Sequence, residues 1–245
     1  MTAGAPRLSW RVATIQQIRD ETAHARTLVL GVPGWPGHLA GQHADIRLTA
    51  EDGYQAQRSY SIASAPESPD LELTIERIDD GEVSPYLVDE ARPGDQFELR
   101  GPVGGYFVWH TRLDGPLLLV GGGSGLVPLM AMLRHHQATA SDVDVRLLLS
   151  ARTLDDVLYR GELEALSGPA VHFTLTRGEP PAGWSGFTGR IDRDMLAAVG
   201  PEPAHRPRVY VCGPTPFVEE AARLLVELGH EPLAVHTERF GPTGG

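Results

Sequence analysis

The organisation of this chain follows from one stretch, Leu117-Leu118-Leu119-Val120-Gly121-Gly122-Gly123-Ser124-Gly125-Leu126-Val127-Pro128, in which four apolar residues run directly into a glycine-rich loop. A continuous apolar run of this length predicts a strand that is buried on both faces. The same order, strand and then helix, recurs further on. The expected pairs are residues 117–120 with 127–135, 145–149 with 155–166, and 209–211 with 217–228. Continuous strands that alternate with helices predict an α/β domain with a doubly wound parallel sheet.

The residues before this stretch follow a different pattern. Six short segments alternate apolar and polar residues, with Gly, Pro and Asp turns between them, at residues 11–15, 27–30, 44–48, 58–62, 71–75 and 96–99. This spacing predicts an antiparallel β-barrel or sandwich, interrupted by one helix over residues 84–91 with Ser84 as its N-cap. We therefore predict two domains, a β-barrel over residues 1–112 and an α/β domain over residues 113–245.

Composition narrows the class of protein. The chain has 245 residues, of which 41% are hydrophobic and 22% charged, and its 28 Gly and 20 Pro disfavour a helical bundle. A formal net charge of -11 argues against nucleic acid or an anionic membrane as a partner, and no apolar run is long enough to span a bilayer. We expect a soluble, cytoplasmic protein. The single cysteine, Cys212, excludes an internal disulfide and an all-cysteine zinc or iron-sulfur site. No metal site is predicted, because the adjacent His135 and His136 face different sides of a helix.

The glycine-rich loop is a candidate nucleotide site. It lies between a strand and a helix, where glycine residues would allow a pyrophosphate to approach the backbone closely. The strict G-x-G-x-x-G pattern fails, because Leu126 stands at the third glycine, so plain turn chemistry remains an alternative. No acidic residue follows the next strand. Arg152, with Tyr159 and Arg160 beyond it, instead suits the 2'-phosphate of NADPH, the alternative being a solvated helix start.

The barrel half carries two further candidate motifs. In Arg58-Ser59-Tyr60-Ser61, Arg58 and Tyr60 share one face of a strand, where a cation beside an aromatic ring could hold a phosphate and a flat ring system. Gly81-Glu82-Val83-Ser84 precedes the expected helix and offers backbone N–H groups to an anion. Each motif alone is also explained by ordinary strand or turn structure.

Five motifs in order give a more specific signal: R-S-Y-S at residues 58–61, G-E-V-S at 81–84, G-P-V-G-G-Y-F at 101–107, G-G-G-S-G-L-V-P at 121–128 and C-G-P at 212–214. From about Leu8 to the C-terminus the chain resembles the ferredoxin-NADP reductase superfamily. The resemblance implies a flavin-binding barrel followed by a nicotinamide-dinucleotide domain, with the flavin ring at their junction.

The resemblance also implies residue roles. Tyr60 would stack on the isoalloxazine of FAD, Ser61 would lie near flavin N5, and Cys212 would lie beside the nicotinamide without acting as a nucleophile. Glu238 would aid proton delivery, and Phe240 would cover the second flavin face. The implied FAD site comprises Arg58, Ser59, Tyr60, Ser61, Gly81, Val83, Ser84 and Phe240. The implied nucleotide site comprises Gly122, Gly123, Ser124, Arg152, Tyr159, Arg160, Cys212 and Gly213. The tail at residues 241–245 would either cover the flavin or be disordered.

The expected function is that of an oxidoreductase that takes hydride from NADPH onto FAD and passes electrons to a separate protein, which could be a ferredoxin, an oxygenase component, or a molybdenum or haem partner. NADH in place of NADPH stays open, as does FMN in place of FAD. Two alternatives remain at this point: a free-flavin reductase, which would release its flavin, and a non-catalytic sensor of flavin or nucleotide.

Overall fold

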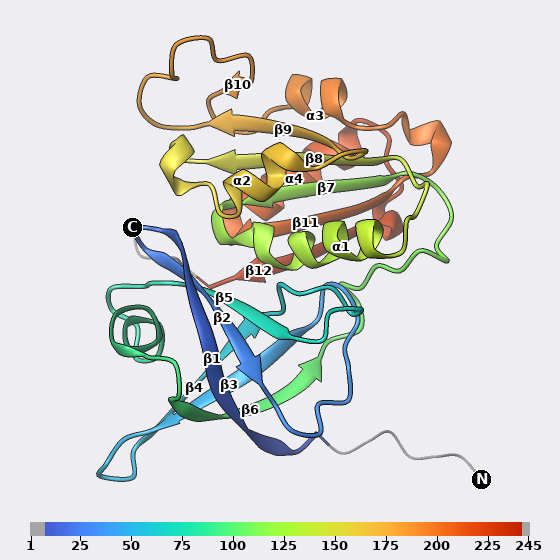
Figure 1. The fold of residues 1–245 in the computed structure, drawn as a ribbon. Coiled ribbons are helices and arrows are strands. Elements are labelled where there is room, and N and C mark those ends of the chain that lie inside the picture. The colour runs from blue at the N-terminus through green and yellow to red at the C-terminus, as the bar shows by residue number, and fades with distance from the viewer. Residues whose placement is uncertain (1–7, 242–245) are drawn as a thin grey trace, which may run out of the picture.

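The structure, a computed structural model, describes residues 8–241 as two stacked halves (Figure 1). The lower half in Figure 1 is built of strands, and the upper half is a sheet with helices on both faces. The expectation for the C-terminal tail concerns residues that lie, apart from Gly241, outside the described range. Residue 112, the expected boundary, falls between the last strand of the lower half and the first strand of the upper half.

The lower half is an antiparallel barrel. Its strands are β1 (Trp10–Thr22), β2 (Ala25–Gly31), β3 (His43–Thr49), β4 (Gln55–Ser61), β5 (Leu71–Glu76) and β6 (Gln96–Val103), in the order β4-β3-β6-β1-β2-β5. A bridge between Ile62 and Leu73 joins the two ends of this order. The interior is filled by fully buried aliphatic side chains such as Leu28, Ile46 and Leu99, which alternate with outward polar residues as the sequence pattern predicts.

One short helical segment covers the barrel. It is a π-helix, η1 (Tyr86–Glu90), whose Leu87 and Val88 pack into the barrel core. The expected N-cap role of Ser84 is wrong: its hydroxyl accepts a hydrogen bond from the Ile78 backbone N–H at 3.0 Å, so it fastens the preceding loop instead. That contact closes the turn at Gly81, where an added Cβ would lie 2.9 Å from Ser84 Oγ.

The upper half is a six-stranded parallel sheet in the order β10-β9-β8-β7-β11-β12. Its strands are β7 (Leu117–Gly122), β8 (Val145–Ala151), β9 (Ala170–Leu175), β10 (Phe187–Thr188), β11 (Arg208–Pro214) and β12 (Val235–Phe240). The α-helices are α1 (Leu126–Ala138), α2 (Arg160–Ala165), α3 (Arg193–Val199) and α4 (Thr215–Glu227). Short 3-10 turns occupy Gly123–Gly125, Leu154–Asp156, Pro203–His205 and Pro232–Ala234. The predicted combination of an antiparallel barrel and a doubly wound parallel sheet is confirmed.

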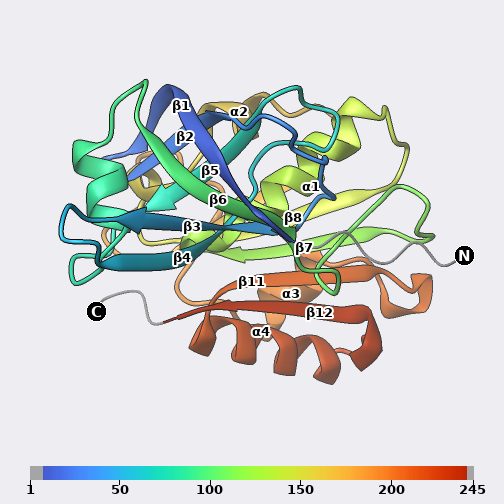
Figure 2. The same cartoon turned by 90° about the horizontal axis from the view of Figure 1, so that it is seen from below.

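The helices divide between the two faces of this sheet. Apolar residues of α1 and α2 share one buried cluster, and those of α3 and α4 share another on the opposite face. Figure 2 shows α4 on one side of β11 and β12, with α1 and α2 on the other side. The first cluster also contains barrel residues, among them Ala63, Phe107 and Trp109, so the two halves share part of one core.

The helix expected over residues 155–166 is interrupted. A 3-10 turn ends at Asp156, α2 begins at Arg160, and between them Tyr159 adopts φ 53° and ψ 27°, which is left-handed backbone. Such a conformation is uncommon for a residue other than glycine. The break turns Tyr159 toward the barrel, with consequences described below.

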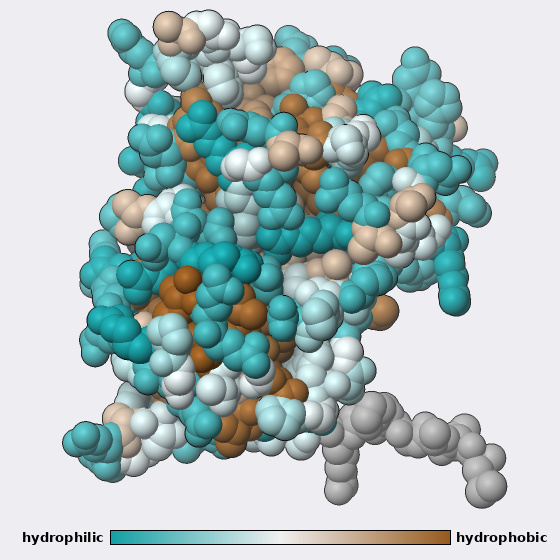
Figure 3. All heavy atoms as spheres, in the orientation of Figure 1, coloured by the Kyte–Doolittle hydropathy of each residue, from teal (hydrophilic) through white to brown (hydrophobic). Residues whose placement is uncertain are grey.

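The outer surface is mostly polar. Figure 3 shows hydrophilic side chains over much of one face, with apolar ones gathered in patches, including one over the barrel half. No helix within residues 8–241 is long and apolar enough to cross a bilayer.

Candidate functional site

Three residues far apart in the sequence meet where the barrel touches the parallel sheet. Cys212 on β11 is paired in register with Gly121 on β7 and with Glu238 on β12. Ser61, the last residue of β4, lies beside the Glu238 carboxyl. That carboxyl lies close enough to Cys212 to raise the pKa of the thiol. The fold therefore brings Glu238 together with the R-S-Y-S and C-G-P motifs.

Glu238 is the titratable group of this junction. Burial raises the pKa of its carboxyl from 4.5 to about 7, and the nearby Ser61 hydroxyl acts in the opposite direction. The Ser61 Oγ atom is buried and forms no hydrogen bond within the protein's described residues. A carboxyl with a pKa near neutrality can both give and take a proton at physiological pH.

Cys212 is fully buried. Burial raises the pKa of its thiol well above the usual value, and the Glu238 carboxyl raises it further. The neutral thiol at neutral pH is a poor nucleophile, which agrees with the expectation that Cys212 acts through packing or position.

The glycines of the strand-to-helix loops allow approaches that a side chain would prevent. A Cβ added to Gly125 would lie 2.1 Å from the Cys212 carbonyl oxygen, and one added to Gly122 would lie 2.9 Å from the Phe217 ring. Gly213 has φ 150°, and its Cβ would lie 2.9 Å from the Gly122 oxygen. The two loops therefore approach each other backbone to backbone at the carboxyl edge of the sheet, where open α/β sheets bind their ligands.

The flavin strand of the expected site presents its residues on different sides. Tyr60 is half-buried and packs against the barrel core, and burial raises the pKa of its hydroxyl. Arg58 is exposed. Ser59 turns away from them and donates to Asp45 at 2.6 Å, an interaction within the barrel wall.

A carboxylate missed at the sequence level lies against Arg58. Glu82 accepts hydrogen bonds from Arg58 Nη2 at 2.8 Å and from the Tyr54 hydroxyl at 2.5 Å. These two hydrogen bonds, that of Tyr54 first, lower the pKa of Glu82. Glu82 belongs to the same loop as Gly81, Val83 and Ser84, so the loop and Arg58 are adjacent in space, as the motif order suggested. The only sequence signal was its place inside G-E-V-S.

The residues expected around the adenosine phosphate are not all together. Arg152 is exposed just after β8, and its carbonyl accepts the backbone N–H of Arg177, which follows β9, at 2.9 Å. Within the described chain neither arginine forms an ion pair. Arg160 is paired with Glu164 on α2 at 2.8 Å. Tyr159 is buried, and its hydroxyl donates to Thr74 of the barrel, so its placement does not favour a contact with the nucleotide.

Phe240 ends β12 beside Pro214 in register and is partly buried against the shared core. His135 and His136 are held by Glu67 and by the Val143 carbonyl, respectively.

Comparison with known proteins identifies the family. Residues 12–108 match the profile of an oxidoreductase FAD-binding domain, and residues 119–223 match that of an oxidoreductase NAD-binding domain. Ferredoxin-NADP reductase B of Sorangium cellulosum is 35% identical over 215 residues, which cover 82% of this chain and 84% of that protein. The chain belongs to the ferredoxin-NADP reductase superfamily. The cofactors of this superfamily of oxidoreductases, FAD and NAD(P)H, are thereby those of the chain.

Other superfamily members extend the comparison. The reductase subunit of glycine betaine monooxygenase from Pseudomonas aeruginosa is 33% identical over 211 residues, covering 83% of this chain but 56% of that subunit. The chain thus spans little more than half the length of that relative. The crystal structure of a cytochrome P450 reductase from Amycolatopsis superposes with a TM-score of 0.82 at 27% identity, covering 97% of this chain and 71% of that one.

The superfamily's cofactors can be tested against the residues present. The orphaned hydroxyl of Ser61 is a buried polar atom in need of a partner, which a flavin heteroatom would supply. Gly123, where an added Cβ would meet nothing within 4 Å, leaves the loop backbone open at the edge where a dinucleotide binds in such sheets. The residues therefore fit both groups.

Proposed function

We propose that this chain is an electron-transfer reductase that oxidises NADPH through bound FAD and delivers electrons singly to a separate acceptor protein. The observation that supports the proposal most is the meeting of Ser61, Cys212 and Glu238 between the flavin strand and the nucleotide loop. Bound FAD supplies the chemistry that divides the two electrons of a hydride into single transfers.

The chain's own residues bind, orient and exchange a proton. Arg58, with the backbone N–H groups of Val83 and Ser84, would hold the FAD pyrophosphate, and Tyr60 and Phe240 would pack against the flat ring. Ser61 donates its free hydroxyl to the ring edge. Glu238 exchanges a proton with solvent or with Ser61, for which its pKa of about 7 suits it. The buried Cys212 would lie beside the nicotinamide and would act through packing.

NADPH is proposed over NADH because of charge at the strand ends. Arg152 and Arg177 stand side by side at the carboxyl edge of β8 and β9, exposed and without a carboxylate partner within residues 8–241. A 2'-phosphate there would gain charge-assisted hydrogen bonds that NADH cannot make. Tyr159 is left out of this proposal, and Arg160 remains a weaker candidate because Glu164 already pairs with it.

An oxygenase component is the acceptor that we propose first. Relatives of this chain are named as reductase subunits or components of monooxygenase and dioxygenase systems. With Cys212 as its single cysteine, this chain has no all-cysteine cluster of its own to receive the electrons.

The test is an anaerobic absorption experiment on the purified protein. A bound-flavin spectrum that NADPH bleaches much faster than NADH is the expected result. Arg152→Ala should weaken NADPH binding by about tenfold or more and leave NADH binding nearly unchanged. Faster bleaching by NADH would overturn the nucleotide choice. Protein that loses its flavin during purification would favour a free-flavin reductase, and protein that neither nucleotide reduces would favour a sensor.

A further inference from the structure

Arg134 in the third turn of α1 crosses from the nucleotide domain to the barrel. Its Nη1 donates to the Ala63 carbonyl at 2.9 Å and to Glu72 at 3.0 Å, both in the barrel. Its Nε and Nη2 donate to the two carboxylate oxygens of Glu162 on α2 at 2.8 and 2.6 Å. The Arg134 side chain is 16% exposed and that of Glu72 14%, so their ion pair is largely desolvated. The bidentate pair with Glu162, which is 38% exposed, ties α1 to α2.

Tyr159, the residue before α2, contacts the barrel across the same boundary. Its ring lies under the Arg134 guanidinium, 4.9 Å from the ring centroid, and its hydroxyl donates to Thr74 on β5. Its backbone N–H donates to Glu21 on β1 at 3.2 Å. The left-handed backbone of Tyr159 is what allows hydroxyl and N–H to reach the same domain, and these contacts hold that unfavourable conformation in place.

The hydrogen bonds around Tyr159 form a closed circuit with one possible direction. The Thr27 hydroxyl must donate to the Glu21 carboxylate, 2.6 Å away, because the ionised carboxylate can only accept. Thr74, 2.7 Å from Thr27, must then donate to Thr27, and Tyr159 must donate to Thr74. The circuit returns through the Tyr159 N–H to the same Glu21 carboxylate. Without Tyr159, the Thr74 hydroxyl would lose the donor that it accepts from, and the Glu21 carboxylate would lose the Tyr159 N–H.

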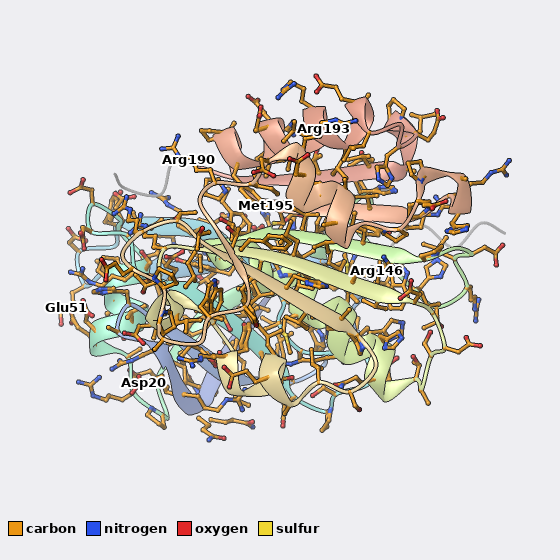
Figure 4. All side chains as sticks on the ribbon, turned by 90° about the horizontal axis from the view of Figure 1, so that it is seen from above. Asp20, Glu51, Arg146, Arg190, Arg193 and Met195 are labelled. Carbon is orange, nitrogen blue, oxygen red and sulfur yellow. The ribbon has the colours of Figure 1, made fainter. Side chains whose placement is uncertain are left out.

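Polar contacts hold the domains together on this side. A cleft of about 650 Å³ opens along the boundary here, lined on the barrel side by Arg19 and Asp20 and on the other by Arg134 and Arg160. Figure 4 shows Asp20 at one margin of the molecule, far from Arg146 on β8. The apolar core shared by the halves does not fill this cleft.

The segments that carry the interdomain contacts of Arg134 and Tyr159 begin next to the proposed cofactor sites. α1 starts directly after the loop at Gly123–Gly125, and Ala63 lies two residues beyond Ser61. Tyr159 lies on the segment that runs from Arg152 at the end of β8 into α2. A shift of Arg134 or Tyr159 would therefore move the nucleotide loop relative to the flavin strand.

We propose that Arg134 and Tyr159 form an interdomain clamp and act as positioning residues, which set the approach between the nicotinamide and flavin sites. The positioning role rests on the proposed function, whereas the clamp itself does not. Hydride transfer needs its reacting atoms within about 3–3.5 Å, so a small change in domain placement has a large effect on rate.

The test compares Tyr159→Phe and Arg134→Met with Arg146→Gln. Tyr159→Phe removes only the hydroxyl that closes the circuit. Arg146 is a matched control, because it also joins a carboxylate, Asp144, to main-chain carbonyls, those of Val199 and Gly200, but entirely within the nucleotide domain. Thermal unfolding of the purified full-length protein should change from one transition in the wild type to two in each clamp variant. Anaerobic stopped-flow bleaching by NADPH should slow by about tenfold or more at saturation, with the NADPH dissociation constant changed less than about twofold.

The outcomes separate the clamp from the function. One unfolding transition together with a wild-type bleaching rate in Tyr159→Phe would overturn the clamp, even if Arg134→Met fails to fold. Equal slowing in Arg146→Gln would also overturn it, because the effect would then be general destabilisation. Two transitions with an unchanged bleaching rate would keep the clamp and reject its positioning role. A wild type that neither nucleotide reduces would sink the proposed function, and the unfolding comparison would still decide the clamp.

Discussion

The affinity of the Glu238 carboxyl for a proton depends on the fold, because folding buries this carboxyl. Its pKa rises from 4.5 to about 7 through burial, so the folded protein binds this proton more tightly than the unfolded chain does. The stabilisation is complete below pH 4.5 and is lost as the pH rises through 7. Glu238→Gln cannot ionise. We expect the unfolding free energy of the wild type to fall by up to about 3 kcal/mol relative to this variant between pH 5 and 8.

Urea unfolding at the two pH values measures the difference, and the pH profile of flavin reduction provides a second readout. The wild-type profile should show a titration near pH 7 that Glu238→Gln lacks. Parallel stability profiles for the two proteins would contradict the raised pKa.

At the expected FAD site, Glu82 accepts a hydrogen bond from Nη2 of Arg58. Its carboxylate takes the Arg58 hydrogen bond that a pyrophosphate would need, so FAD must displace it or share the guanidinium. We expect Arg58→Gln to raise the dissociation constant of FAD by about tenfold or more, because a hydrogen bond to a charged group contributes about 1.5–3 kcal/mol. Glu82→Gln should lower it.

Quenching of flavin fluorescence by apoprotein gives these constants. Glu220→Gln is the matched control, since Glu220 is also exposed and paired with an arginine, Arg223, but on α4. Weaker FAD binding in Glu82→Gln would show that this carboxylate orients Arg58 for the cofactor and does not compete with it.

At the scale of the elements, the two glycine loops work as one unit. A Cβ on Gly125 would lie 2.1 Å from the Cys212 carbonyl, and backbone cannot move aside as a side chain can. We expect Gly125→Ala to destabilise the protein by about 1–3 kcal/mol and to weaken NADPH binding, while FAD binding to the barrel is kept.

Gly161→Ala is the control, because no atom lies within 4 Å of its added Cβ. In α2 the control should be neutral or stabilising by up to about 1 kcal/mol. Calorimetry and nucleotide titration check both, and equal behaviour of the two variants would refute the close approach.

The predictability of the elements follows from how local their causes are. The six barrel strands and the pair β7 and α1 were predictable because alternation and apolar runs are written in consecutive residues. The break at Tyr159 was not, because the partners that hold its backbone, Glu21 and Thr74, lie 138 and 85 residues away. The inner strand β9 and the two-residue edge strand β10 also escaped, since His172 and Thr174 interrupt the apolar pattern of β9 and β10 is too short to show one. At the site, motif order predicted the neighbourhood of Ser61, whereas Glu82 and Arg134 act through contacts that no local pattern marks.

At the scale of the whole molecule, two kinds of contact join the domains. The shared apolar core around Trp109 joins the halves on one side, and the interdomain clamp joins them beside the cleft. Apolar contacts allow small sliding, whereas directional hydrogen bonds fix orientation. The combination explains how one chain can hold two cofactor sites in register through a boundary that is not fully closed.

The net charge of the whole molecule should govern how an acceptor reaches it. With 21 Arg and Lys residues against 32 Asp and Glu residues, the formal charge is -11, so the far field favours cations and repels anions. Reduced protein should therefore pass electrons to hexaammineruthenium(III), a trivalent cation, more slowly as salt screens the attraction. Ferricyanide, an anion, should react faster. Between about 10 and 300 mM salt we expect the second-order rate constant for hexaammineruthenium(III), divided by that for ferricyanide, to fall by about tenfold. The reason is that the screening length shrinks below the size of the protein. Stopped-flow oxidation of the prereduced protein measures both constants. Because acceptors respond to the charge where the electron leaves, a ratio that is constant or rises with salt would mean that a local arginine-rich surface outweighs the global field, and would favour an acidic acceptor protein.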